Sequence, residues 1–282
     1  MSKRRSYLFV PAIRKDFLEK LDKYNCDVVI LDLEDSVMPS HKEEARKNLY
    51  DLDFNRIKNK EILIRINSVD GPFITDDLKL VNNKNPDGIM IPKLDDEKQI
   101  EFLEKNTMGM EFVPIIETIK GFFNAHKILV CSKRITSFAF GAEDFCMESE
   151  IKKGNLKENP VLLNVISTLL LIAKQNNLWY IDCVYTGFGT EEHLNNLKEE
   201  AEFTKNFGAN AKLLIHPSQI DVVNDIFSIS KDEIQKAKEF LNDFENLKTG
   251  SFVVTHDNIM EDTPSYKKYT KLLGKAKRLG YI

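Results

Sequence analysis

The stretch Phe138-Ala139-Phe140-Gly141-Ala142-Glu143-Asp144 decides the fold prediction for this chain. Its apolar run stops at a glycine and is followed at once by two carboxylates. The same arrangement occurs where residues 112–116 lead into Glu117, and where residues 28–31 lead into the segment Asp32-Leu33-Glu34-Asp35. A buried carboxylate is costly without a partner. We therefore expect the acids at the ends of these apolar runs to share one partly solvated site.

Acids that converge without matching basic side chains need a cation, and their oxygen atoms suit Mg²⁺. A second interpretation is that each acid caps the helix that follows it, because Asp and Glu are favoured at the amino ends of helices. That alternative explains a single acid well, but it is weaker for three apolar runs in succession. The pattern therefore predicts a magnesium site at the ends of the strands.

Apolar runs and helical patterns alternate along the chain, with no hairpin signal in the first 224 residues. Strands that are apolar throughout favour a parallel sheet covered by helices. Eight such units and a length of about 250 residues are typical of a (β/α)8 TIM barrel, an α/β fold. The predicted strands cover residues 7–10, 27–31, 61–67, 87–91, 111–116, 135–140, 179–182 and 212–215. The predicted helices cover residues 14–24, 42–52, 76–81, 96–104, 118–130, 160–175 and 191–206, and a last one ends near residue 224.

A doubly wound open sheet is the alternative fold. It normally has a glycine-rich phosphate turn after the first strand, and Val10-Pro11-Ala12-Ile13 is not such a turn. In a TIM barrel the active site lies at the C-terminal ends of the strands. The polar residues at those positions are Glu34, Asp35, Arg65, Asn67, Lys93, Glu117, Glu143 and Asp144.

The chain continues beyond the eighth unit, so we expect a barrel domain over residues 1–225 and an extension over residues 226–282. In the extension, Ser230 and Glu233 form a capping-box pattern that opens a helix. Residues 252–254 and 258–260 are typical of a short hairpin. We expect the apolar face of the last helix to cover the barrel or a neighbouring subunit. That face carries Tyr266, Tyr269, Leu272, Leu273 and Ala276.

The composition is that of an ordinary globular protein of 282 residues. Lys and Arg number 40 against 44 Asp and Glu, a net charge of −4, so we expect no nucleic-acid partner. The longest apolar run, residues 169–173, is far too short to cross a membrane, and we expect no signal peptide. Four scattered cysteines predict reduced thiols in a cytoplasmic protein.

A series of motifs resembles the citrate lyase beta-subunit family, part of the HpcH/HpaI aldolase superfamily that includes malyl-CoA and citramalyl-CoA lyases. The resemblance implies a TIM barrel, a magnesium ion, and cleavage or formation of a C–C bond next to a thioester. It also implies homo-oligomers, trimers or hexamers, in which the C-terminal segment reaches a neighbouring active site. The motifs are Arg5-Ser6-Tyr7-Leu8-Phe9-Val10-Pro11, Asp32-Leu33-Glu34-Asp35-Ser36-Val37, Arg65-Ile66-Asn67, Pro92-Lys93, Ile116-Glu117-Thr118, Gly141-Ala142-Glu143-Asp144 and Ile215-His216-Pro217-Ser218-Gln219.

The resemblance implies roles for the acids. Glu117 and Asp144 match the family's metal ligands, and Glu117 is also expected to contact the substrate. Glu34 and Asp35 match acids that hold water on the metal ion. Asp262 lies in a segment that resembles the family's Met-Ile-Asp-x-Pro, whose aspartate acts as acid/base from the adjacent subunit in some members.

The resemblance implies roles for three basic residues as well. Arg65 matches the arginine that grips the substrate carboxylate. Lys93 and Arg5 match positions near the mouth of the barrel, at the C-terminal ends of its strands, where a carboxylate or the phosphates of a thioester carrier dock. Lys93 ends a strand, as a Schiff-base lysine would, but the chemistry requires no Schiff base and an anion partner is the favoured interpretation.

The resemblance thus predicts a Mg²⁺-dependent lyase acting on a 3-hydroxyacyl thioester such as citramalyl-CoA, malyl-CoA or citryl carrier protein. One departure concerns the family's Tyr-x-Asp-x-x-Asp pattern, where this chain has Tyr185-Thr186-Gly187-Phe188-Gly189-Thr190. That departure motivates a second hypothesis, an aldolase acting on a free 2-oxo acid or another substrate without CoA. A third hypothesis is a non-catalytic barrel subunit, which has no need of so costly a cluster of acids.

Overall fold

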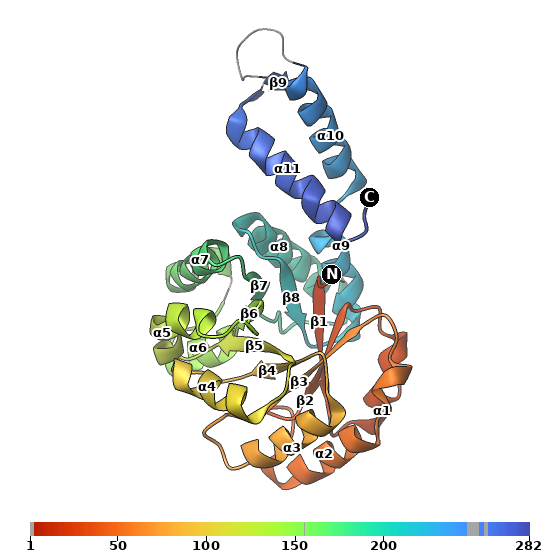
Figure 1. Ribbon diagram of the computed structural model, residues 1–282, viewed down its shortest axis with the longest axis vertical. Coiled ribbons are helices and arrows are strands. Elements are labelled where there is room, and N and C mark those ends of the chain that lie inside the picture. Colours follow the sequence, from red (N-terminus) through yellow and green to blue (C-terminus); the bar gives the residue numbers. More distant parts are fainter. Residues whose placement is uncertain (1–2, 155, 247–253, 257–258) are drawn as a thin grey trace. The chain divides into compact units, whose positions relative to one another are not determined.

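The computed structural model of the protein describes residues 3–154, 156–246, 254–256 and 259–282. Strands β1 to β8 follow one another around a closed barrel, and each pairs in parallel with its neighbours (Figure 1). The predicted TIM barrel is confirmed. Its strands are β1 Ser6–Pro11, β2 Val28–Asp32, β3 Glu61–Arg65, β4 Gly88–Ile91, β5 Glu111–Ile116, β6 Ser137–Phe140, β7 Trp179–Asp182 and β8 Ala211–Leu214.

Helices surround the barrel on its outer side (Figure 1). The helix predicted over residues 160–175 is confirmed, with a proline in its first turn and the Asn159 side chain accepting hydrogen bonds from the N–H groups of Val161 and Leu162. The helices of the barrel are α1 Lys15–Leu18, α2 Lys42–Asp51, α3 Ile74–Lys84, α4 Glu97–Asn106, α5 Ile119–Val130, α6 Ala142–Glu148, α7 Pro160–Gln175, α8 Glu191–Phe207 and α9 Ile220–Phe227.

Two helices differ from the prediction. The helix expected over residues 14–24 is only the four-residue α1, followed by a 3₁₀ turn at Leu21–Lys23. Both Leu18 and Leu21 are buried, and the 3₁₀ turn keeps residues three apart on one face. Helix α6 was not predicted; it begins directly after Gly141 and has Asp144 in its first turn. The N-cap of α6 is Gly141 and no side chain caps the helix, so Asp144 lies in the first turn without acting as a cap.

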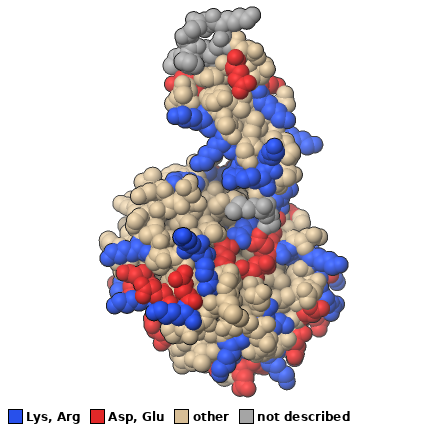
Figure 2. Space-filling model, in the orientation of Figure 1, with Lys and Arg blue, Asp and Glu red and all other residues tan. Residues whose placement is uncertain are grey.

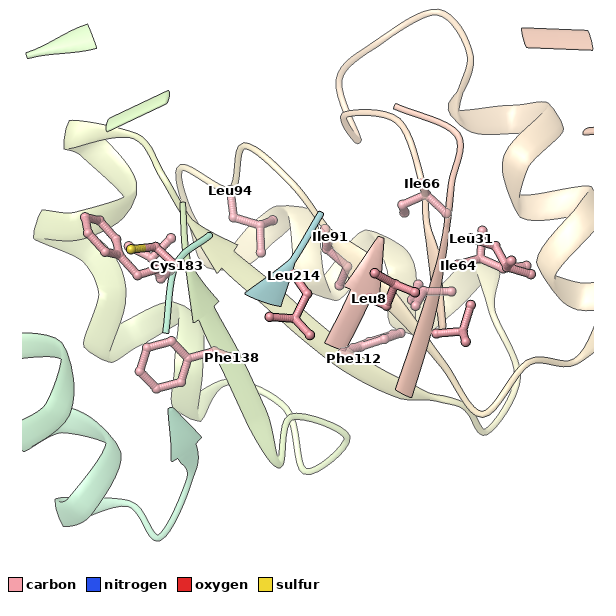
Figure 3. Packing of buried hydrophobic residues seen from close by; sticks show 14 of the residues in the cluster. Leu8, Leu31, Ile64, Ile66, Ile91, Leu94, Phe112, Phe138, Cys183 and Leu214 are labelled. Carbon is pink, nitrogen blue, oxygen red and sulfur yellow. The ribbon is translucent and has the colours of Figure 1, made fainter. Parts of the chain in front are cut away.

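The apolar side chains of the strands divide into two layers. Those facing outward, such as Leu8, Ile64 and Phe138, pack beneath the helices in one large core (Figure 3). Those facing inward fill the barrel with a smaller cluster that includes Tyr7 and Met90. This alternation is the period of two expected of strands covered on both faces. No helix among the described residues combines the length and apolar character needed to span a membrane.

The chain divides into two compact units, residues 4–227 and residues 228–282 with the first residues of the chain. The second unit contains α10 Lys231–Glu245, β9 Val254–His256, β10 Ile259–Glu261 and α11 Thr263–Arg278. The capping box of Ser230 and Glu233 is confirmed, and β9 and β10 pair as an antiparallel hairpin. Residues 252, 253 and 258 of the predicted hairpin lie outside the described residues.

The apolar face of α11 has a partner that the sequence analysis did not consider. The ring centroids of Phe240 and Tyr269 lie 4.8 Å apart, and those of Phe244 and Tyr266 are separated by the same distance. Both phenylalanines belong to α10, so the two helices of this unit cover each other's aromatic side chains. The tyrosines on the apolar face of α11 are therefore covered within this unit and do not by themselves require contact with a barrel.

Candidate active site

The inward side chains change from apolar to charged at the mouth of the barrel. Val113 and Ile115 of β5 face the interior, and Glu117 follows them on the same side because strand side chains alternate. In the same way Arg65 follows Leu63 of β3. The C-terminal ends of the strands meet at this mouth, so residues far apart in the sequence become neighbours there.

Glu117 and Asp144 lie next to each other. Glu117 is only 3% exposed, and the backbone N–H of Lys93 donates a hydrogen bond to its Oε1 at 2.8 Å. Burial and the Asp144 carboxylate raise the pKa of Glu117 to about 8. Burial and the charge of Asp35 raise the pKa of Asp144, although it shares a hydrogen bond with Glu117. Both carboxylates are therefore short of positive charge.

Gly141 makes this close approach possible. A Cβ atom at position 141 would lie 2.4 Å from Oε2 and 2.5 Å from Cβ of Glu117. Those distances are far below van der Waals contact, so any larger residue would displace the Glu117 side chain. Because α6 begins directly after Gly141, the same glycine determines how near Asp144 comes to Glu117.

Arg65 is held by Asp32, a residue that the sequence analysis gave no role of its own. The Nε and Nη2 atoms of Arg65 donate to the two Asp32 carboxylate oxygens at 2.6 and 2.7 Å. The register of β2 and β3 puts these two residues opposite each other. Burial alone would raise the pKa of Asp32, but the guanidinium outweighs it and lowers that pKa. One edge of Arg65 is thereby fixed, while Nη1 on its other edge lies 3.3 Å from Glu34 Oε2.

Glu34, Asp35 and Lys93 form an ion network beside Arg65. Lys93 Nζ donates to Glu34 and, at 3.1 Å, to Asp35, and Arg65 Nη1 lies 3.3 Å from Glu34 Oε2. The Lys93 backbone has φ of 52°, in the left-handed region that residues other than glycine rarely adopt. This conformation lets one residue direct its N–H to Glu117 and its ammonium group to the two acids after β2.

The charge balance at the mouth shows which acids a metal ion fits. Arg65 and Lys93 are engaged by the three acids at the end of β2. Glu117 and Asp144 form no ion pair within the part of the chain that the structure describes. Carboxylate oxygens are ligands that Mg²⁺ prefers. The residues predicted as metal ligands are thus brought together in an arrangement that fits the ion.

Two further residues support the loop after β2. Lys42 is buried at the start of α2, and its Nζ donates to the backbone oxygens of Leu33 and Glu34, both at 2.7 Å. Ser36 donates its hydroxyl to Asp32 at 2.5 Å. No local pattern marks Lys42 in the sequence, because it lies in a helix rich in charge. Together these contacts hold the loop that carries Glu34 and Asp35.

A cavity of about 380 Å³ opens at the mouth. Its polar side is formed by residues of the network described above, and its other walls are apolar. A second cavity of about 460 Å³ lies between the loops after β2 and β3, and Asp35 and Ser36 border both. The apolar walls of the first cavity are Phe9, Pro11, Ile115, Phe140, Ala142, Val184, Leu213 and Ile215.

Arg5 is not part of this site. It precedes β1, at the end of the barrel opposite the mouth, and its backbone N–H and Nε donate to Asp27 Oδ2 at 2.8 and 2.7 Å. The expected contact between Arg5 and the substrate is therefore wrong, because a residue at the start of a strand belongs to the base of the barrel. Its neighbour Arg4 closes that base through ion pairs with Glu61 and Glu111.

Asp262 belongs to the second unit, directly before α11. Its side chain is exposed and makes no capping hydrogen bond to that helix. The other predicted site residues belong to the barrel unit. The catalytic role of Asp262 stays a prediction.

A second cluster of potential metal ligands contains Asp182, Cys183 and Glu200. The ammonium group of Lys212 already occupies it, with Nζ 2.5 Å from Asp182 Oδ2 and 2.8 Å from Glu200 Oε1. Lys212 and Asp182 are fully buried between the sheet and α8. The chain thus supplies its own cation at this cluster, and a metal ion does not fit there.

The HpcH/HpaI aldolase/citrate lyase family has a model that matches residues 5–217. The chain belongs to this family. Two curated members are similar over most of their length. The mitochondrial citramalyl-CoA lyase of Homo sapiens is 30% identical over 94% of this chain and 83% of its own. A (3S)-malyl-CoA thioesterase of Cereibacter sphaeroides is 29% identical over 86% of this chain and 83% of its own.

A solved structure in the HpcH/HpaI aldolase/citrate lyase family agrees with the fold. The protein CitE from Mycobacterium tuberculosis, in complex with magnesium, acetoacetate and coenzyme A, superimposes with a TM-score of 0.82. It is 25% identical in sequence, and the similarity covers 99% of this chain and 98% of CitE. The likeness thus extends over nearly the whole chain.

The raised pKa of Glu117 predicts that Mg²⁺ binding depends on pH. Below about pH 8 the metal-free Glu117 is protonated, so a cation must displace that proton to bind. We expect the Mg²⁺ affinity to fall by about tenfold for each pH unit below that value and to level off above it. Calorimetry at pH 7 in two buffers with different ionisation enthalpies should detect the released proton. Equal apparent enthalpies in both buffers would contradict the prediction.

Proposed function

We propose that the protein is a Mg²⁺-dependent carbon–carbon lyase that cleaves or forms a 3-hydroxyacyl thioester such as citramalyl-CoA, malyl-CoA or citryl carrier protein. The observation that carries the proposal is the meeting, at one barrel mouth, of Arg65 and the uncompensated acids Glu117 and Asp144. The similarity to a citramalyl-CoA lyase, and to a structure with magnesium and coenzyme A, supports the same cofactor and substrate class here.

Arg65 is proposed to bind the carboxylate next to the substrate's hydroxyl group. The Asp32 pair prevents the guanidinium from turning, and the Nη1–Nη2 edge, where Nη1 lies 3.3 Å from Glu34 Oε2, would present two parallel N–H donors to the carboxylate. Glu117 and Asp144 would hold the metal ion beside it, with Glu34 and Asp35 around them. When bound, Mg²⁺ supplies Lewis-acid stabilisation of the negative charge that develops on the reacting oxygen.

The proposed reaction needs a base at the substrate hydroxyl. Loss of that proton lets the adjacent C–C bond break, which yields an oxo acid and the enolate of the thioester, and the enolate carbon then takes up a proton. The acids at the mouth are committed to Mg²⁺ and to Lys93, so we assign the proton transfer to Asp262 of a partner subunit. The apolar walls of the 380 Å³ cavity keep bulk water from the enolate.

The second cavity suits the thioester arm. It begins at Asp35 and Ser36, where it meets the first cavity, and its lining includes Met38, Pro39 and Phe73. In the substrate, the thioester arm is joined to the part that becomes the oxo acid. The arm therefore needs a continuation out of the first cavity. We therefore place the oxo acid in the first cavity and the thioester arm in the second.

The test is to incubate the purified protein with citramalyl-CoA, malyl-CoA and free 2-oxo acids, with and without Mg²⁺. We expect an oxo acid and a shortened acyl-CoA to appear from one thioester only when Mg²⁺ is present. Release of free CoA without an oxo acid would instead indicate a thioesterase, the activity in the name of one relative. Absence of turnover with every thioester would contradict the proposal.

A second candidate is an aldolase acting on a free 2-oxo acid. Its support is the turn after β7, which departs from the family's Tyr-x-Asp-x-x-Asp pattern and where Phe188 stacks on His216 with ring centroids 4.4 Å apart. Gln219 holds this turn through hydrogen bonds to the backbone oxygens of Tyr185 and Gly187, both at 2.9 Å. Turnover of free acids but of no thioester would select this candidate.

We further propose that the protein is a cytoplasmic homo-oligomer, a trimer or hexamer. The resemblance to oligomeric family members supports the assembly, and four free thiols support a reducing compartment. Light scattering coupled to size-exclusion chromatography measures the mass directly. A monomer at micromolar concentration would contradict the proposed assembly.

Replacing Arg65 by lysine is expected to be far from conservative. A single ammonium group cannot hold both oxygens of Asp32 and also present a fork to a carboxylate. We expect kcat/KM to fall by roughly 10²-fold or more, the scale that misplacement of a substrate group costs. The Asp32→Asn variant, with Arg65 intact but free to turn, should show a smaller loss. An Arg65→Lys enzyme within a few-fold of wild type would place the carboxylate contact elsewhere.

A further inference from the structure

Helix α11 of the second unit is strongly basic. Its 16 residues include six Lys and Arg side chains and no acid, whereas α10 carries three lysines and five acids. Figure 2 shows more blue than red over the visible side of this unit. The helix macrodipole favours cations in the last turn only. It accounts for the three basic residues of that turn, but not for Lys267, Lys268 and Lys271, which lie further toward the amino end.

Most of these cations lie along one line on the surface of α11. At about 100° per residue, Lys267, Lys271 and Arg278 fall within about 40° of one another around the helix axis. Lys271 lies about 160° around the helix from Tyr269, which packs on Phe240 of α10. The cations therefore face away from α10, and those three are exposed. We call this line the basic stripe, and its residues are Lys267, Lys268, Lys271, Lys275 and Arg278.

The basic stripe lacks a matching set of acids. No acid in the described ranges of the chain forms an ion pair with Lys267, Lys271 or Arg278. Lys267 and Lys271 are four residues apart, as are Lys271 and Lys275, and like charges at this spacing destabilise a helix. An anion bound along the stripe would remove this repulsion. The charge pattern thus favours a ligand with several negative charges.

We propose that the basic stripe binds the phosphates of coenzyme A, namely its diphosphate bridge and the phosphate on its ribose. This site rests on the proposed function, in which Asp262 acts at the mouth and the thioester arm leaves through the second cavity. The described cations that border the two cavities are Arg65, Lys42 and Lys93, and each is already engaged by acids or by carbonyl oxygens. The phosphates therefore need cations from beyond the mouth.

The position of the stripe fits the length of the arm. Asp262 directly precedes α11, and Lys271 and Lys275 lie about 14 and 20 Å further along the helix. In coenzyme A, the chain from the sulfur to the first phosphate is as long as about four extended residues, or about 14 Å. With Asp262 at the reacting hydroxyl group, an arm that runs beside α11 brings its phosphates level with these two lysines.

The size of the stripe favours a small ligand over a protein partner. The stripe is about 16 Å long on a helix about 10 Å wide, so it covers roughly 160 Å². A specific protein–protein interface needs about 800 Å² on each partner. Lys and Arg bind phosphate through charge-assisted hydrogen bonds, which are stronger than neutral ones. A small ligand with three phosphates therefore matches both the area and the charge.

Calorimetric titration of the full-length protein with coenzyme A, dephospho-coenzyme A and pantetheine tests the proposal without any turnover. We expect the affinity to fall in that order, as phosphates are removed. The Lys267→Gln, Lys271→Gln, Arg278→Gln variant should bind coenzyme A about 30-fold more weakly, at about threefold for each exposed charge. It should bind pantetheine as the wild type does.

The matched control removes three exposed lysines from α10 and should bind coenzyme A as the wild type does. Its substitutions are Lys231→Gln, Lys236→Gln and Lys238→Gln. Both triple variants lose the same net charge, so the comparison separates the stripe from the overall charge of the unit. Glutamine is a good helix former, so circular dichroism should show an unchanged helix content in both.

Turnover supplies a second readout. The stripe variant should raise KM for the coenzyme A thioester about 30-fold, and its kinetics with the corresponding pantetheine thioester should be those of the wild type. Equal losses of coenzyme A affinity in the two triple variants, or no loss in the stripe variant, would overturn the proposal. So would tighter binding of inorganic triphosphate, or of an acidic carrier protein, than of coenzyme A. Stripe-dependent binding of coenzyme A by a protein that cleaves no thioester would support this site and contradict the proposed lyase function.

Discussion

The Glu117→Gln, Asp144→Asn double variant is expected to lose Mg²⁺ binding and all magnesium-dependent activity while it keeps its fold. Both substitutions retain the size of the side chain but replace a charged oxygen donor by an amide. The wild-type pair lacks an ion-pair partner among the described residues, and its raised pKa values show that this position disfavours two negative charges without a cation. Removing the charges should therefore leave stability in the absence of metal unchanged or slightly increased.

Calorimetric titration with Mg²⁺ and circular dichroism together check this expectation. The control is Glu143→Gln, because Glu143 is adjacent to Asp144 but is exposed and paired with Lys153 at 2.8 Å. It should bind Mg²⁺ as the wild type does. Wild-type Mg²⁺ affinity in the double variant would show that these two acids are not the ligands.

An inactive Asp262→Asn protein mixed with an inactive Arg65→Ala protein is expected to recover part of the activity. Asp262 and Arg65 lie in different units of the chain. If Asp262 acts at the mouth of a neighbouring subunit, each site combines Arg65 of one subunit with Asp262 of another. Each variant then removes only one of these two residues. After exchange of subunits, some mouths will combine an intact Arg65 with an intact Asp262. The recovered activity should increase with exchange and approach about a quarter of the wild-type value in an equal mixture.

This experiment needs proof that subunits exchange, which mass spectrometry of differently tagged variants provides. The control is a mixture of Asp262→Asn with the Glu117→Gln, Arg65→Ala double variant. It should recover the same activity, because both barrel lesions then lie in one chain. Confirmed exchange without recovery would contradict a shared site. So would a wild-type monomer that is fully active.

The fold was predictable because its signal repeats along the whole chain. Several of the apolar strands lead into polar residues, and a TIM barrel collects the strand ends at one mouth. Glu117 and Asp144 could be placed at the mouth in this way, since each follows an apolar run in the sequence. The strand bounds also agree closely, because a strand buried on both faces leaves a continuous apolar run.

Contacts that depend on register or on chain direction were not predictable in the same way. Asp32, Glu34 and Asp35 are nearly equivalent acids in the sequence, and the pairing of β2 with β3 selects Asp32 as the partner of Arg65. Arg5 was misplaced because a motif at the start of a strand was interpreted as part of the mouth. The left-handed conformation of Lys93 has no signal in the sequence, since lysine rarely adopts it.

The buried ammonium group of Lys212 has a consequence for work with chelators. It fills the cluster of Asp182 and Glu200 with a cation that is covalently part of the chain, so no chelator can extract it. The acids at the mouth, in contrast, are proposed to bind an ion that exchanges with solvent. Dialysis against a chelator should therefore abolish catalysis but leave the barrel folded. On this proposal, the protein separates a permanent charge that supports its architecture from a removable one that controls its chemistry.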